Sequence, residues 1–193
     1  MRAFGRTLFV VAALVTLVRE PLQAQEMAMP VGVQFSVFTR VFAFDRQFGR
    51  RAREEIVIGI VYQRRVPESS NIKEAVAEEL RSGVSVRGRP IRVLPIPVAR
   101  SEDLEAALSL HDIDVLYITP LRSLDLDGIT TLSRRHRVLT CTGVPDYVTQ
   151  GLAVGIGARR SRPLILINLA AARAEGAEFS SELLKLAQII EGS

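Results

Sequence analysis

Few side chains of the kinds that carry out catalysis or bind metals are present, and they are widely spaced. The chain has two histidines, His111 and His136, and one cysteine, Cys141. Neither histidine is spaced from a carboxylate or from the cysteine in a way that suggests a metal site. Both fall at expected helix ends, where a positive side chain interacts favourably with the helix dipole. The sequence therefore predicts no metal and no cofactor. Cys141 lies in an apolar run, which favours burial of its thiol.

Sequence motifs of common enzyme families are also absent. Gly155-Ile156-Gly157 lies in a strand pattern and no helix follows it, unlike a dinucleotide-binding fingerprint. Ser181 and Lys185 are four positions apart, so they do not form the S-x-x-K pair of penicillin-recognising enzymes. We therefore expect a protein that is not an enzyme. The alternative, an exported enzyme, would need ionisable groups that converge in a cleft.

Polar positions at strand ends and paired arginines are the remaining candidates for binding. In sheets of parallel strands, ligands bind at the carboxyl edge, which would place Thr119, Thr142 and Gly143 beside a small ligand. Paired arginines could bind anions or an acidic partner surface, although pairs in polar turns are more often simply solvated. The pairs stand at 50–51, 64–65, 134–135 and 159–160.

The elements that would position these residues alternate between short apolar strands and amphipathic helices. This alternation favours parallel strands joined by right-handed crossovers. The apolar runs 152–158 and 164–169 are joined by a short polar linker and predict an antiparallel hairpin. We expect a single α/β domain with a mixed, mostly parallel sheet and helices on both faces. Strands are expected at 56–61, 84–86, 91–94, 114–119 and 137–142, and helices from Asn71 to Gly83, from Ser101 to His111 and from Leu124 to His136.

An aromatic helix is expected at residues 33–49, which carry five phenylalanines. At helical spacing Phe35, Phe38 and Phe42 form one apolar stripe, and polar residues fill the opposite side. This helix is expected to anchor the core, and the exposed part of its broad apolar face is a candidate contact for a partner.

The last segment, FSSELLKLAQIIE, predicts a final helix. Leu183, Ala187 and Ile190 share one of its faces at helical spacing. Ser180 or Ser181 would cap its first turn.

The N-terminal segment has the layout of a secretory signal peptide. Two arginines precede an apolar run of about a dozen residues, which is too short for a transmembrane helix. Residues 1–24 are expected to be removed by cleavage between Ala24 and Gln25, which leaves residues 25–193 as the mature domain in the periplasm. An uncleaved membrane anchor is the alternative.

The charge of the mature chain is close to balanced. Without the leader the chain has 22 basic and 20 acidic residues, mixed along the sequence. Nucleic acid as a partner would require a basic stripe, so this pattern argues against it. No second apolar segment is long enough to cross a membrane, so we expect no stable membrane insertion after cleavage.

The C-terminal third contains a series of short motifs in a fixed order: a Leu-Thr strand, a short helix that ends at a glycine, a strand pair, and an alanine-rich run before a serine pair. These motifs are Leu139-Thr140, Gly151, Ile167-Asn168-Leu169 followed by three alanines, Gly176, Ser180-Ser181 and Leu183-Leu184-Lys185-Leu186-Ala187. In these features the stretch from Val138 to Ile190 resembles the YfiR family of small periplasmic proteins. Weaker similarity continues upstream in the same order, through the aromatic helix, the strand at 58–60 and the run at 88–91.

What the resemblance implies is regulation. A YfiR-like protein binds the periplasmic sensory part of an inner-membrane diguanylate cyclase and keeps its cytoplasmic output low until stress or an envelope partner relieves the block. Other members of the family are expected to serve other membrane sensors, such as histidine kinases, and members often self-associate, which leaves a homodimer open. Many members have cysteines in the first strand and just before the central one, and this chain has Ile58 and Ile113 near those places, so the resemblance carries no redox-sensing role over to it.

The predicted function is therefore a non-enzymatic periplasmic regulator that represses an inner-membrane signalling protein by binding its inactive conformation more tightly. Its candidate contact surface comprises Phe48 on the aromatic helix together with Arg159 and Arg160. The alternative is a periplasmic small-solute binding protein that signals to a membrane partner. A deep polar pocket at the strand ends would favour solute binding, and a flat apolar patch would favour the regulator.

Overall fold

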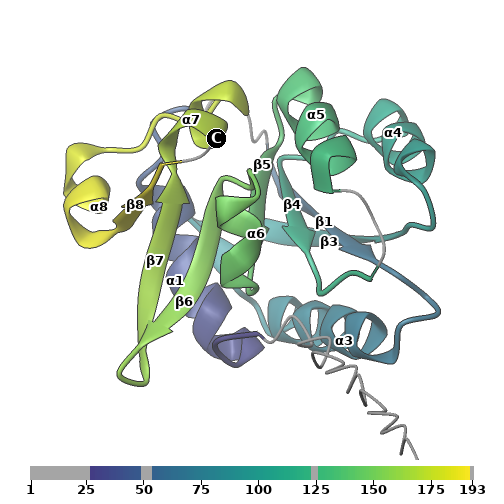
Figure 1. Cartoon of the computed structure of the whole chain (residues 1–193), viewed down its shortest axis with the longest axis horizontal. Coiled ribbons are helices and arrows are strands. Elements are labelled where there is room, and N and C mark those ends of the chain that lie inside the picture. The colour runs from purple at the N-terminus through teal and green to yellow at the C-terminus, as the bar shows by residue number, and fades with distance from the viewer. Residues whose placement is uncertain (1–26, 49–53, 123–125, 192–193) are drawn as a thin grey trace, which may run out of the picture.

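The computed structural model describes residues 27–48, 54–122 and 126–191. They form one domain around an eight-stranded sheet that has helices on both faces (Figure 1). From one edge to the other the strands follow the order β2, β3, β1, β4, β5, β6, β7 and β8. Their bounds are β1 Ile56–Tyr62, β2 Ser85–Val86, β3 Arg89–Pro97, β4 Val115–Ile118, β5 Leu139–Thr142, β6 Val154–Arg159, β7 Arg162–Asn168 and β8 Gln188–Ile190.

The centre of the sheet is parallel and its margins are mixed. β3, β1, β4, β5 and β6 are parallel neighbours. At one margin β2 pairs antiparallel with β3. At the other margin β7 pairs antiparallel with β6, and β8 pairs parallel with β7. The predicted α/β domain with a mostly parallel sheet and a C-terminal antiparallel hairpin is therefore confirmed.

The helices form two layers because successive side chains of each strand point to opposite faces of the sheet. In β1, Ile58 packs in the apolar cluster under α1 and α3, whereas Val57 packs in the cluster under α4, α5 and α6. The C-terminal helices α7 and α8 add Ala172 and Leu183 to the first cluster. The helix bounds are α1 Val31–Ala43, α3 Pro67–Arg81, α4 Ser101–Leu110, α5 Leu126–His136, α6 Pro145–Thr149, α7 Leu169–Ala174 and α8 Ser181–Leu186.

The aromatic helix anchors the core as predicted, but it is shorter than predicted. Phe35, Phe38 and Phe42 are fully buried. The helix ends at Ala43 rather than at residue 49, because the chain turns at Asp45. The buried Asp45 carboxylate accepts hydrogen bonds from the backbone N–H groups of Gln47 and Glu178, both at 2.9 Å. Such local bonds to an aspartate compete with helical backbone bonds.

Helix α3 begins at Pro67, before the predicted start at Asn71. Proline is favoured at a first helical position because its fixed φ suits the helix and its missing N–H is not needed there. Helix α4 begins at the predicted residue, Ser101, although the residue in the capping position is Arg100.

The prediction of one final helix was wrong in its second half. Helix α8 ends at Leu186, and Gln188–Ile190 form the edge strand β8, in which Ile189 lies opposite Ile167 of β7. β-branched residues favour strands, and the free edge of β7 offers backbone partners to them. The cap of α8 is Ser180, whose hydroxyl accepts a hydrogen bond from the third residue of the helix at 3.4 Å.

The β6–β7 hairpin is tighter than its polar linker suggests. The strands continue to the pair Arg159 and Arg162, so that only Arg160 and Ser161 form the turn. Both have positive φ, 48° and 62°, which is the backbone of a type I′ turn. This turn matches the right-handed twist of the two strands.

Residues 1–24 and the boundary at Ala24 and Gln25 lie outside the described residues, so the signal peptide stays a prediction. Within residues 27–48, 54–122 and 126–191, no helix combines the length and apolar character needed to cross a membrane.

Candidate functional site

The carboxyl edge of the parallel strands, the place that the sequence suggests for a small ligand, is filled by the protein's own side chains. Thr119 is fully buried. Its hydroxyl lies 2.6 Å from the Ser69 hydroxyl and donates to the Val61 carbonyl at 2.8 Å. The Thr142 hydroxyl donates to the Ile118 carbonyl at 2.9 Å. Both threonines therefore link neighbouring elements and leave no group for a ligand.

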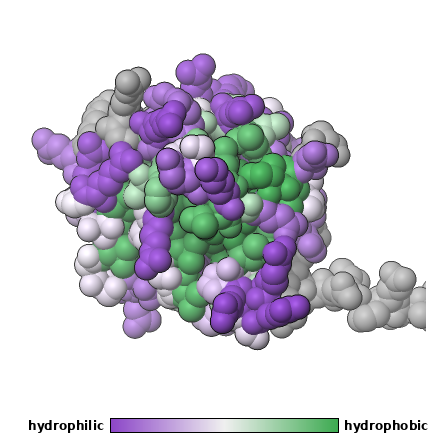
Figure 2. All heavy atoms as spheres, turned by 90° about the vertical axis from the view of Figure 1, so that its left-hand side faces the viewer, coloured by the Kyte–Doolittle hydropathy of each residue, from purple (hydrophilic) through white to green (hydrophobic). Residues whose placement is uncertain are grey.

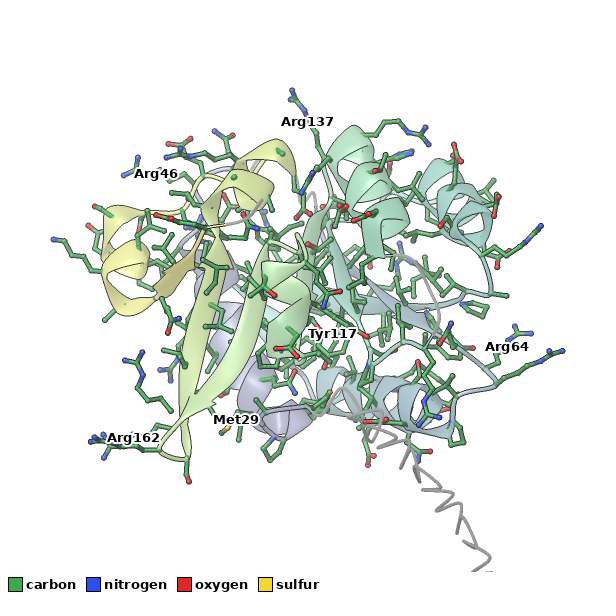
Figure 3. All side chains as sticks on the ribbon, viewed as in Figure 1. Met29, Arg46, Arg64, Tyr117, Arg137 and Arg162 are labelled. Atoms are coloured by element: carbon green, nitrogen blue, oxygen red, sulfur yellow. The ribbon has the colours of Figure 1, made fainter. Side chains whose placement is uncertain are left out.

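Gly143, the third residue expected at this edge, is packed against α1. A Cβ at position 143 would lie 2.4 Å from Gln34 Nε2. Gln34 is held in place because its Nε2 donates to the Met29 carbonyl at 2.7 Å and its Oε1 accepts from the Tyr117 hydroxyl at 2.9 Å. Burial raises the pKa of Tyr117, so its hydroxyl keeps the proton. Figure 3 shows Tyr117 in the interior of the domain and Met29 below it. Helix α1 thus closes this edge.

A hollow of about 930 Å³ lies at the opposite edge, where the parallel strands begin. Val57 near the start of β1, Asp114 before β4 and Val138 before β5 line it. Both histidines, His111 and His136, lie on its wall. Its lining mixes charged and apolar side chains, and its volume falls in the range of small-molecule sites. We call it the amino-edge hollow.

A buried carboxylate, Glu175, lies just after α7 and is fully buried. Its oxygens accept hydrogen bonds from the Thr140 backbone N–H at 2.7 Å and from the Ser133 hydroxyl at 2.9 Å. Burial raises the pKa of Glu175 to about 7, although these hydrogen bonds and the charge of Arg134 act in the opposite direction. The side chain joins α7 to α5 and β5 and changes charge near neutral pH.

The thiol of Cys141 is fully buried, as predicted. Burial raises its pKa well above the ordinary value, and the nearby Glu175 charge adds to the shift. The thiol therefore stays protonated, and a protonated buried thiol is a poor nucleophile and metal ligand.

An exposed apolar face lies at the free edge of the sheet. Figure 2 looks at this side of the molecule and shows hydrophobic atoms gathered in its centre with hydrophilic side chains around them. Leu186 at the end of α8 is 70% exposed, Ile189 in β8 is 42% exposed and Phe44 after α1 is 39% exposed. The Phe44 carbonyl accepts a hydrogen bond from the Ser180 N–H at 3.0 Å, which places Phe44 beside the start of α8. We call Phe44, Leu186 and Ile189 the apolar face.

The prediction that Phe48 contacts a partner is wrong. Its side chain is 1% exposed. Its ring stacks on Phe42, with the ring centroids 5.3 Å apart. The turn at Asp45 directs the chain back toward the sheet, so Phe48 belongs to the core and Phe44 is the phenylalanine that faces outward.

The predicted arginine contacts, Arg159 and Arg160, are exposed at the tip of the hairpin. Figure 3 shows Arg162 of the same tip at the lower end of the molecule, away from Arg46 and Arg137 at its upper end. The Arg159 guanidinium donates to the Gln188 side-chain carbonyl at 3.1 Å. Because Gln188 belongs to β8, the hairpin tip adjoins the same free edge as the apolar face.

The residues that carry the family resemblance have structural roles. Asn168 caps α7, where its side-chain oxygen accepts a hydrogen bond from the third residue of the helix at 3.0 Å. Gly151 has a φ of 109°, which side chains rarely allow, at the turn after α6. Ser180 caps α8, Ser181 is its exposed first residue, and Leu184 is half-buried against the core. These residues build the C-terminal elements on which the apolar face stands.

Comparison with protein families matches residues 47–188 to the family described as YfiR/HmsC-like. This chain belongs to the YfiR/HmsC-like family. The family consists of periplasmic, non-catalytic regulatory proteins that generally interact with an inner-membrane signalling partner. Membership fits a periplasmic regulator of cyclic-di-GMP signalling in general terms. A search among curated proteins gives no match.

Three solved structures of bacterial proteins have a similar fold. The ABC domain in complex with L-Trp from Streptococcus pneumoniae has a TM-score of 0.61 and 11% identity, with 83% of this chain and 60% of that chain covered. A conserved domain protein from Vibrio cholerae has a TM-score of 0.60 and 14% identity, with 84% of this chain and 60% of that chain covered. CD0873, a substrate-binding protein with adhesive properties from Clostridium difficile, has a TM-score of 0.51 and 16% identity, with 76% of this chain and 58% of that chain covered.

At these identities the similarity establishes the fold of this chain, which spans about three-fifths of the length of those structures. Sequence reasoning missed three features of the site: the amino-edge hollow, the buried Glu175 and the exposed Leu186. Of these, Glu175 left a trace in the sequence, as a single acid in a run of small residues. Leu186 follows Leu183 by three positions, so helical spacing places it beside the apolar stripe and gives no sign of its exposure.

Proposed function

We propose that this chain is an exported, non-enzymatic regulator that binds the periplasmic part of an inner-membrane diguanylate cyclase and represses it. Family membership supports this proposal, and the apolar face at the β8 edge is the structural observation that carries it. In this proposal residues 1–24 direct export and are cleaved between Ala24 and Gln25, and residues 25–193 are the working domain.

The apolar face has the features of a docking surface for another protein. Among the residues that the structure describes, β8 is the last strand of the sheet and pairs with β7 alone. Soluble proteins usually protect such an edge with charged residues, and edge strands otherwise accept a strand from a partner. Here the edge carries Ile189, and Leu186 stands next to it with most of its surface in water. Contact with a partner would remove these side chains from water, and each Å² of apolar surface buried would stabilise the complex by about 25 cal/mol.

The arginine tip adds charge to the same edge. Arg159 and Arg160 would pair with acidic groups of the cyclase at the rim of the contact, while the apolar face forms its centre. Interfaces of this composition gain most of their affinity from the apolar centre, and rim charges mainly set the association rate and the partner choice.

Repression follows if the regulator binds the inactive conformation of the sensor domain more tightly than the active one. Each tenfold difference in affinity shifts the equilibrium by about 1.4 kcal/mol. A signal in the envelope would relieve repression by competing for the apolar face.

The test is capture of the tagged protein from the envelope of its host after crosslinking, with one matched pair of variants. L186D places a charge on the apolar face. L110D places the same charge on Leu110, which is 78% exposed at the end of α4. We expect the wild type and L110D to recover the same inner-membrane protein with a cyclase output domain, and L186D to lose it. Equal recovery by L186D would contradict the proposal.

The alternative function is a periplasmic small-solute binding protein that signals to a membrane partner. Two of the similar structures are described as bound to L-Trp and as a substrate-binding protein, which favours this alternative. A co-purified small molecule without any membrane protein would support solute binding over the regulator.

The same experiments test two further expectations about partners. A histidine kinase in the captured fraction would change the class of the membrane partner. A mass of twice the monomer in solution would show a homodimer.

A further inference from the structure

We infer that the amino-edge hollow binds a small organic anion, held by the guanidinium groups of Arg137 and Arg173. Both arginines line the hollow, and Figure 3 shows Arg137 at the upper edge of the domain between α5 and α7. The ligand carries a carboxylate or phosphate group on an apolar body. The inference goes beyond the proposed regulation and does not rest on it, because binding is measured on the purified protein alone.

The acids on the wall of the hollow are already engaged. Glu55 forms an ion pair with Arg92 at 2.6 Å. The Asp114 carboxylate accepts a hydrogen bond from the Val57 backbone N–H at 2.8 Å. Asp112 has a partner as well. The negative charges that line the hollow are therefore committed to groups of the protein.

Glu178, the remaining acid of the wall, is engaged in the same way. It accepts a hydrogen bond from Gln47 Nε2 at 2.8 Å and pairs with Arg46 at 3.3 Å. In contrast, neither the Arg137 nor the Arg173 guanidinium makes a hydrogen bond or ion pair with another residue that the structure describes. Two guanidinium groups in one hollow with no partner among the described residues favour a negatively charged ligand, because bonds between guanidinium and carboxylate or phosphate are strong and often bidentate.

The backbone at Arg137 ends helix α5 and decides which substitution can test the site. The Val138 N–H bonds to the Ser133 carbonyl at 2.9 Å and the Arg137 N–H bonds to the Arg134 carbonyl at 3.3 Å. This pair of bonds is the Schellman motif that ends many helices. Arg137 occupies its left-handed position with a φ of 55°. Glycine is the usual residue there, because a side chain strains this conformation. Arg87 and Arg160 have the same backbone geometry outside the hollow, so the geometry does not itself indicate binding, but it allows Arg137 to be replaced by glycine without loss of the helix end.

The rest of the hollow suits an organic anion better than an inorganic one. Val57, Leu108, Ile113 and Val138 contribute apolar surface to the same wall. The volume of about 930 Å³ is far more than a single phosphate or sulfate ion would fill. The hollow therefore offers charge for the acidic group and apolar contact for the body of the ligand.

The test is titration of the purified protein with benzoate and with phenyl phosphate. Binding is measured by calorimetry and by the change in melting temperature. Benzamide serves as the uncharged isostere of benzoate, and inorganic phosphate reports the charge alone. We expect at least one organic anion to bind and to raise the melting temperature, while benzamide does not. Tighter binding of phenyl phosphate than of benzoate would identify the phosphate group as the preferred acid, and the reverse would identify the carboxylate.

Two variants and one control separate binding from folding. R137G should raise the melting temperature of the unliganded protein by about 2–4 °C, because it relieves the backbone strain, and yet weaken anion binding about tenfold or more. R173Q should weaken binding to a similar extent. R160G removes the side chain from a similar left-handed backbone position outside the hollow, with a φ of 48°. It should leave anion binding unchanged. Failure of both anions to bind the wild type, or wild-type affinity in both R137G and R173Q, would overturn the inference.

Discussion

Replacing Glu175 with glutamine tests whether one buried carboxylate makes the stability of the fold depend on pH. Burial raises the pKa of Glu175 from 4.5 to about 7. The side chain accepts hydrogen bonds from Thr140 N at 2.7 Å and from the Ser133 hydroxyl at 2.9 Å. Glutamine has nearly the same shape, and its amide can keep a bond to each of these groups without ionising.

Whether the free energy of unfolding rises or falls with pH depends on which state, folded or unfolded, holds the Glu175 proton more tightly. The pKa of Glu175 is higher in the folded protein than in the unfolded chain, so the folded protein keeps the proton over a wider pH range. The stabilisation is complete below the unfolded pKa of 4.5 and is lost as the pH rises through about 7. The difference between these two pKa values corresponds to roughly 3 kcal/mol of unfolding free energy.

The assay is urea unfolding of the wild type and of E175Q at several values from about pH 5 to about pH 8. We expect the free energy of unfolding of the wild type to fall by roughly 2–3 kcal/mol relative to E175Q over this range. The exposed Glu78 on α3 supplies the control, and E78Q should follow the wild type. Parallel curves for the wild type and E175Q would refute the assignment of this pH dependence to Glu175.

Three further predictions concern single side chains. Native Cys141 should react slowly with a thiol reagent and rapidly after unfolding, because it is fully buried with a raised pKa; rapid reaction of both states would contradict its burial. R137G and R160G should each stabilise the fold by about 1 kcal/mol in urea, because both remove a side chain from a left-handed backbone position; a loss of stability in both would show that the strain is absent. F48A should destabilise the fold by about 3–5 kcal/mol, because Phe48 is a stacked core residue; an unchanged unfolding midpoint would mean that the ring is not packed as described.

The order and type of most elements could be predicted from the sequence because local patterns decide them. Fully apolar runs such as the one at Ile58 mark strands that are covered on both faces. The spacing of the phenylalanines marks the first helix, and Gly151 marks a turn that needs positive φ. The hairpin was predictable because two apolar runs flank a polar linker that includes Arg160.

The remaining features depend on contacts between distant segments. The second half of the predicted last helix becomes a strand because β7 has a free edge beside Ile189, and no local pattern records that edge. Phe48 is buried because Asp45 bonds to residues near α8 and ends α1 early. The amino-edge hollow joins His111 and His136 from the ends of two different helices, α4 and α5, whereas the expected site at Gly143 is closed by α1.

The most direct test of the regulatory account is the cyclic-di-GMP content of the host cell. A strain that lacks this chain should contain more cyclic di-GMP than its parent, and the wild-type chain should restore the parental level. L110D should restore it as well, whereas L186D should reach the periplasm in normal amount and leave the level high. An unchanged level in the deletion strain, or full restoration by L186D, would contradict the proposal that this chain represses a cyclase through its apolar face.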